Sequence, residues 1–83
     1  MARLKFKATE RGFAIAEFTD FYGNECSIQR SSIATEDCIW LGVDRPHPEI
    51  PDAKRMHLSR EQVATLLPAL TRFATRGKLP GER

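Results

Sequence analysis

Residues 58–77 have the sequence LSREQVATLLPALTRFATRG, which carries the start and stop signals of one α-helix. Ser59 and Gln62 have the spacing of a capping box, in which each residue bonds the backbone of the other. Gly77 supplies the left-handed residue at which many helices end. These signals predict a helix over residues 59–76.

The apolar side chains of this segment recur with the helical period of 3.6 residues, so the helix is predicted to be amphipathic. The expected apolar face consists of Val63, Leu66, Leu67, Leu70, Phe73 and Ala74. Pro68 lies opposite that face, where a kink would bend the helix around a sheet with its convex side toward water. We therefore expect one bent helix that continues through Pro68.

Upstream of the helix, apolar and polar residues alternate with the period of two that is typical of half-buried strands. This alternation predicts strands over residues 3–8, 13–19 and 25–30. Residues 20–24 contain the aspartate, glycine and asparagine that a hairpin loop with a positive φ angle requires. The three strands are expected to form a meander.

The segment 38–43, CIWLGV, is apolar on both faces, which is typical of a central strand that a helix covers on one side. Polar residues 31–37 are expected to form a loop. Residues 44–54 contain three prolines and predict a semi-rigid surface loop, and residues 55–58 predict a short fifth strand. The fold class is thus α+β: an antiparallel β-meander of four to five strands packed against one C-terminal amphipathic helix. Residues 1–83 are expected to form a single domain that ends in a short basic tail, 77–83.

Trp40 raises a question of orientation, because neighbouring residues of a strand point to opposite faces of the sheet. If Ile39, Leu41 and Val43 face the helix, Trp40 lies on the uncovered side, where a large aromatic residue is a typical anchor for a partner. The alternative is that the long loop covers Trp40, or that Trp40 is itself a core residue.

The composition excludes several classes of protein. The chain of 83 residues has a net charge of +2 and lacks an apolar run of the roughly 20 residues that a membrane-spanning helix needs. Its first residues alternate charged and apolar side chains, unlike a signal peptide, so a cytoplasmic location is expected. Both ends are basic and the middle is acidic. The two cysteines, Cys26 and Cys38, are predicted to be buried free thiols.

Catalytic and metal-binding patterns have little support in this sequence. Cys26, Cys38, His47 and His57 lack the short ligand spacings of a zinc site. Cys38 with His57 is the best available nucleophile–base pair, but no oxyanion-hole loop or orienting residue accompanies it. Nucleotide-binding glycine motifs are absent from the sequence. We therefore predict no enzymatic activity, no catalytic residue, no metal and no cofactor.

Nucleic-acid binding is the main alternative function. Lys5 and Lys7 share the outer face of the first predicted strand, and Arg72 and Arg76 make the C-terminal end of the helix basic. Aromatic residues of the 20–24 turn could stack on bases. However, 13 basic residues against 11 acidic ones do not amount to the charge footprint of a typical nucleic-acid binder.

Three segments, FTDFYGNECSIQ (18–29), SSIATEDCIWLG (31–42) and RMHLS (55–59) leading into the Leu-Leu-Pro helix, resemble a group of small phage and prophage proteins of unknown function. The resemblance implies an accessory protein acting in the bacterial cytoplasm, which binds a host or defence protein in the manner of anti-CRISPR proteins.

The expected mode of action is therefore protein–protein contact with a partner of bacterial host or phage origin. A homodimer is an alternative. The candidate contact residues are Trp40, Phe21, Tyr22, Pro46 and Ile50.

Overall fold

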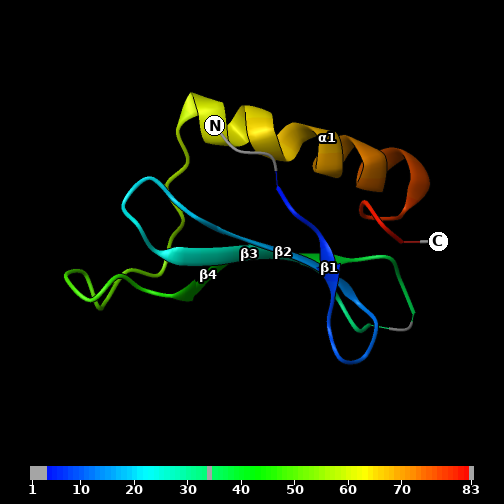
Figure 1. Ribbon diagram of the computed structural model, residues 1–83, viewed down its shortest axis with the longest axis horizontal. Coiled ribbons are helices and arrows are strands. Elements are labelled where there is room, and N and C mark those ends of the chain that lie inside the picture. Colours follow the sequence, from blue (N-terminus) through cyan, green and yellow to red (C-terminus); the bar gives the residue numbers. More distant parts are fainter. Residues whose placement is uncertain (1–3, 34, 83) are drawn as a thin grey trace.

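The computed structural model describes residues 4–33 and 35–82 and has two layers, one sheet and one helix (Figure 1). The four strands are antiparallel and follow the chain in the order β1-β2-β3-β4. The predicted α+β meander with a C-terminal helix is thus confirmed. The elements are β1 (Lys7–Ala8), β2 (Ala14–Thr19), β3 (Glu25–Arg30), β4 (Ile39–Arg45) and α1 (Arg60–Arg76).

The central hairpin of β2 and β3 matches the predicted boundaries closely. Its register runs from Ile15 opposite Gln29 to Thr19 opposite Glu25. Gly23 in the connecting turn has a φ angle of 84°, the left-handed conformation that glycine adopts without a steric penalty. The predicted positive-φ turn is therefore confirmed.

The sheet differs from the prediction at both ends. β1 spans two residues in place of the predicted 3–8, of which residue 3 lies outside the described part of the chain. Within the described residues, 55–58 form no fifth strand. His57 bonds the β2–β3 turn instead, because the His57 carbonyl accepts a hydrogen bond from the Phe21 N–H at 2.7 Å. β4 is consequently an edge strand, although its sequence is typical of a central one.

The core lies between the helix and one face of the sheet. Its fully or nearly buried residues are Ala14, Ala16, Ile28, Leu66, Ala69 and Leu79. Ile39 and Leu41 of β4 pack against this core and are half-buried. Cys26 is buried as predicted, but Cys38 is only half-buried because it precedes the edge strand.

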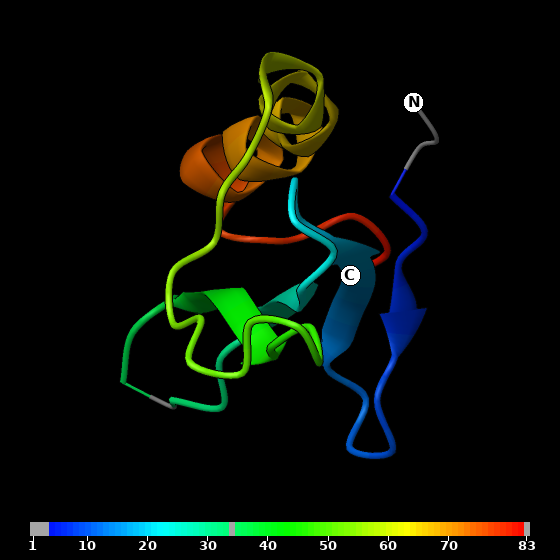
Figure 2. The same ribbon diagram turned by 90° about the vertical axis from the view of Figure 1, so that its left-hand side faces the viewer.

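The C-terminal segment 77–82 is part of the core, in contrast to the predicted basic tail. After α1 the chain turns back and passes between helix and sheet (Figure 2). Leu79 is fully buried there. The small side chains of Ala14 and Ala16 on the facing strand leave room for this extra segment. Leu79 thus belongs to the core between the two layers.

The helix begins at Arg60, directly after its predicted N-cap Ser59, and ends at the predicted Arg76. Ser59 accepts a hydrogen bond from the Gln62 N–H at 3.2 Å, and the Gln62 side chain accepts from the Ser59 N–H at 2.8 Å, which completes the capping box. Gly77 ends the helix with a φ angle of 69° and donates to the Phe73 carbonyl at 2.7 Å. The helix continues through Pro68, which is exposed.

The buried face of α1 is rotated relative to the predicted one. Leu66 and Ala69 are buried, whereas Val63 and Leu67 are 43% and 51% exposed. The predicted apolar stripe is wider than the area that the sheet can cover. The N-terminal segment around Phe6 and the C-terminal segment both lie along the Ala69 side of the helix, and this side therefore turns inward. Among the described residues, no helix combines the length and the apolar character that crossing a membrane requires.

Arg30 joins the end of the sheet to the end of the helix. Its guanidinium donates to the Gly77 carbonyl at 2.6 Å and to the Asp37 carboxylate at 2.5 Å. It also lies 5.8 Å from the centre of the Phe73 ring and 3.9 Å from the Glu82 carboxylate. Charge-assisted hydrogen bonds are among the stronger ones in proteins, so this contact sets the position of the helix C-terminus.

The adjacent residues Leu66 and Leu67 provide a matched test of the helix orientation. We expect Leu66→Ala to lower the free energy of unfolding by roughly 2 to 5 kcal/mol, because a buried leucine leaves a cavity. Leu67→Ala should change it by less than about 1 kcal/mol, as is usual for exposed positions. Urea titrations of both variants measure the difference. Equal losses would contradict the orientation described above.

Candidate interaction surfaces

The outer face of the sheet, on the side away from α1, presents one large aromatic side chain. Trp40 lies on this face, paired with Gln29, and is 68% exposed. Ile39 and Leu41 point to the opposite side, toward the core. Of the two orientations that the sequence allowed, the structure has the one in which Trp40 is uncovered.

The surroundings of Trp40 on the outer face are mostly polar. The Lys7 ammonium lies 2.9 Å from the Glu17 carboxylate, and Arg45 lies 3.6 Å from Glu25. The bond to Lys7 lowers the pKa of the Glu17 carboxyl. These exposed ion pairs add little stability, but they place charged groups of both signs on the same face of the sheet as the aromatic residue.

A second candidate surface lies at the end of the sheet where β2 turns into β3. The buried carboxylate of Asp20 organises it by accepting four hydrogen bonds of 2.9 to 3.0 Å. The donors are the backbone N–H groups of Tyr22, Asn24 and His57 and the side-chain amide of Asn24. Burial raises the pKa of Asp20, but the hydrogen bonds together outweigh it, so the pKa lies below its ordinary value.

This carboxylate holds three aromatic rings together at the surface. The ring centres of Tyr22 and His57 are 5.0 Å apart, and those of Phe21 and Tyr22 are 5.2 Å apart, both in edge-to-face geometry. Phe21 and Tyr22 are 64% and 55% exposed. We call Phe21, Tyr22 and His57 the turn cluster. Phe21 and Tyr22 are the two members that the sequence predicted as contact residues, whereas the contact with His57 depends on the return of the chain to the turn.

The proline-containing loop lies at the same end of the sheet as the turn cluster. The His47 N–H donates to the Asn24 side chain at 2.8 Å, and the Ile50 N–H donates to the His47 carbonyl at 2.9 Å. Pro46 is half-buried and Ile50 is 38% exposed. The five predicted contact residues therefore divide into two groups. Phe21, Tyr22, Pro46 and Ile50 lie toward the turn end, while Trp40 lies toward the other end of β3.

The basic residues of the nucleic-acid alternative do not share one face. Lys7 lies on the outer sheet face, where Glu17 partly neutralises it. Lys5 is exposed on the segment before β1, and Arg72 and Arg76 belong to α1 on the other side of the sheet. Arg72 is half-buried, and its Nε has no hydrogen-bond partner among the residues that the structure describes.

The thiols and imidazoles do not come together. The Cys38 carbonyl accepts a hydrogen bond from the Ser31 N–H, just after the end of β3. His57 contacts the turn that precedes β3, at the opposite end of that strand. The Cys38–His57 pair is therefore not formed. Burial, followed by the nearby Asp20 charge, raises the pKa of Cys26 to about 11, which makes this thiol a poor nucleophile. In residues 4–33 and 35–82, no group of acidic, cysteine and histidine residues could hold a metal ion.

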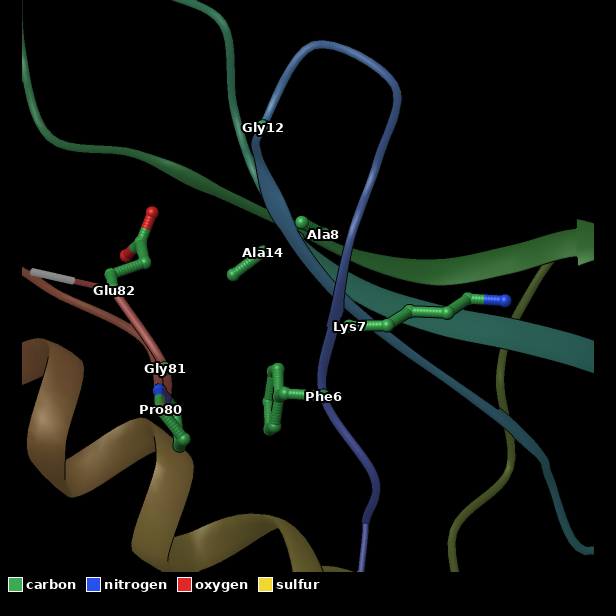
Figure 3. Close-up of a pocket in the computed structure, with 8 residues that line it drawn as sticks. All are labelled: Phe6, Lys7, Ala8, Gly12, Ala14, Pro80, Gly81 and Glu82. Carbon is green, nitrogen blue, oxygen red and sulfur yellow. The ribbon is translucent and has the colours of Figure 1, made fainter.

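A surface cavity of about 470 Å³ lies between β1 and the C-terminal segment (Figure 3). The Phe6 ring points toward Pro80 there, while the Lys7 side chain points away. The Glu82 carboxylate on its rim already accepts from the Leu79 N–H at 2.6 Å. Sequence reasoning missed this region, although the Pro80-Gly81 pair after an apolar residue is a turn signal. The cavity contains a carboxylate but lacks an adjacent nucleophile or base among its lining residues.

Comparisons with known protein families, with curated proteins and with solved structures find no match to this chain.

The buried Asp20 carboxylate predicts a defined loss of stability in acid. Its pKa is lower in the folded than in the unfolded chain, where it is about 3.9. The ionised group therefore stabilises the fold above about pH 4, and this contribution disappears as the pH falls through the folded pKa. Asp20→Asn should thus lower the free energy of unfolding at pH 7. As the pH falls from about 5 to about 2, the free energies of unfolding of this variant and of the wild type should approach each other.

Urea titrations over that pH range measure this difference. The exposed Asp52 is the matched position, and Asp52→Asn should stay close to the wild type at every pH. A gap between Asp20→Asn and the wild type that is independent of pH would show that the Asp20 charge does not contribute as argued.

Proposed function

We propose that this protein acts without catalysis, by binding another protein through the outer face of its sheet around Trp40. The observation that carries the proposal is the 68% exposure of this tryptophan on the face of the sheet opposite α1. A tryptophan buries a large apolar area when a partner covers it, and it is among the most frequent hot-spot residues of protein interfaces.

The surroundings of Trp40 are also typical of an interface. An apolar anchor within a polar rim is the usual organisation of such surfaces. Here the rim includes Gln29 and the Lys7–Glu17 ion pair. The hydrogen-bonded strands below hold these groups in a fixed arrangement, which lowers the entropy cost of binding.

The turn cluster supports the same function as a second contact region. Its aromatic rings are exposed, yet the Asp20 hydrogen bonds fix their backbone. The resemblance to phage proteins adds the proposal that the partner is a bacterial host or defence protein, whose complex the chain would inhibit. Nucleic-acid binding has less support, because Lys7 and the arginines of α1 lie on opposite sides of the sheet.

Trp40→Ala tests the proposed surface, with Leu67→Ala as a control that removes an exposed apolar side chain from the helix. Tagged wild-type protein and both variants are used to capture proteins from a bacterial lysate, with and without nuclease treatment, and the affinity for the captured partner is then measured. We expect Trp40→Ala to weaken binding by about 30-fold, the effect of a typical hot spot. Leu67→Ala should bind as the wild type does.

Circular dichroism shows whether both variants stay folded. Equal binding by all three proteins would contradict the role of Trp40. Loss of the captured material on nuclease treatment would favour the nucleic-acid alternative.

A further inference from the structure

We propose that the free edge of β4 pairs antiparallel with β4 of a second copy of this chain, with the two-fold axis at Leu41. The pairing would join two four-stranded sheets into one. It does not rest on the function proposed above, since Trp40 could bind another protein in either a monomer or a dimer.

The hydrogen bonds of β4 show which backbone groups are available at this edge. The Ser31 N–H donates to the Cys38 carbonyl at 2.9 Å. This bond continues the β3–β4 ladder, in which Gln29 pairs with Trp40 two residues further along. In an antiparallel ladder every second residue bonds the same neighbour, so Trp40 and Gly42 bond β3. The N–H and C=O groups of Ile39, Leu41 and Val43 consequently point away from β3, to the open edge.

Open edges of this length are usually protected by charges, proline or a covering segment. In β4 the regular ladder runs from Ile39 to Val43, and the register shift lies beyond Val43. The residues of this regular part carry no charge, and the connections leave the strand at its two ends (Figure 1). Ile39, Leu41 and Val43 are only half-buried although they point toward the helix layer. β4 thus has the apolar character of a central strand, and pairing would give it a neighbour on both sides.

The sequence of β4 is complementary to itself about Leu41. This register places Ile39 opposite the second copy's Val43, and Trp40 opposite the second copy's Gly42. The Trp40–Gly42 pair is of the type without mutual hydrogen bonds, in which side chains come closest. Gly42 has open space where a Cβ would lie, so the indole can pack over it. Pairing of an aromatic residue with glycine across strands is a known stabilising device.

Charge distinguishes this register from its neighbours. About Leu41, Asp37 lies near the second copy's Arg45, which follows the register shift after Val43. Both side chains are exposed, and each pairs with an opposite charge of its own chain, Arg30 and Glu25. A register about Trp40 places Glu36 opposite Asp44, two like charges. A register about Gly42 places the apolar Ile39 and Trp40 opposite the charged Arg45 and Asp44. Opposite charges and matched apolar residues therefore favour the register about Leu41.

Amide hydrogen exchange of the wild-type chain tests the pairing directly. In dilute samples the N–H groups of Ile39, Leu41 and Val43 should exchange rapidly, while those of Trp40 and Gly42 are protected. Sedimentation should show a dimer at high concentration, and the three edge amides should then become protected in parallel. A monomer at millimolar concentration, or a dimer in which these amides still exchange rapidly, would overturn the proposal.

Gly42→Val tests the register. Because the position has open space, the variant should keep the monomer fold, as shown by continued protection of the Trp40 amide. The new side chain would collide with the second copy's Trp40 and raise the dimer dissociation constant by at least about tenfold. Thr19→Val, on the outer face of β2, is the matched control and should dimerise as the wild type does. Unchanged dimerisation of Gly42→Val would exclude the register about Leu41.

Discussion

The buried carboxylate of Asp20 is the contact on which the arrangement of the turn end depends. A carboxylate out of water needs hydrogen-bond donors, and here the donors come from the β2–β3 turn and from the segment that leads into the helix. Asn24 extends the network to the proline-containing loop through His47. One charged group therefore determines where two long connections meet the sheet.

Arg30 has the corresponding role at the other end of β3. It bonds the helix terminus at Gly77 and the loop before β4 at Asp37. A side chain at Gly77 would come within 2.6 Å of the Asp37 carboxylate, so this junction requires glycine for space as well as for its φ angle. With both helix ends held, the helix covers one face of the sheet and leaves the other open, and this asymmetry gives the protein its candidate binding surface.

The small core explains why exposed and half-buried apolar residues are frequent. The helix rests partly on the C-terminal segment, with Leu79 between the two layers. This segment and the N-terminal strand region cover one side of α1, so Leu67 stays exposed. Similarly, β4 lies at the margin of the layer that the helix covers. The unsatisfied apolar surface of a domain this size is then available for association.

The sequence by itself determined the elements whose signals are local. Four features depend only on neighbours within a few residues: the capping box of Ser59, the glycine at residue 77, the turn at residues 20–24, and the alternation of β2 and β3. Only the tertiary structure decided the features that depend on distant contacts: the short β1, the edge position of β4, the rotation of α1 and the buried Leu79. Periodicity shows that a face is apolar, but which segment covers that face depends on the packing of the whole chain. For the same reason Trp40 could be identified as a candidate from the sequence, whereas its exposure required the structure.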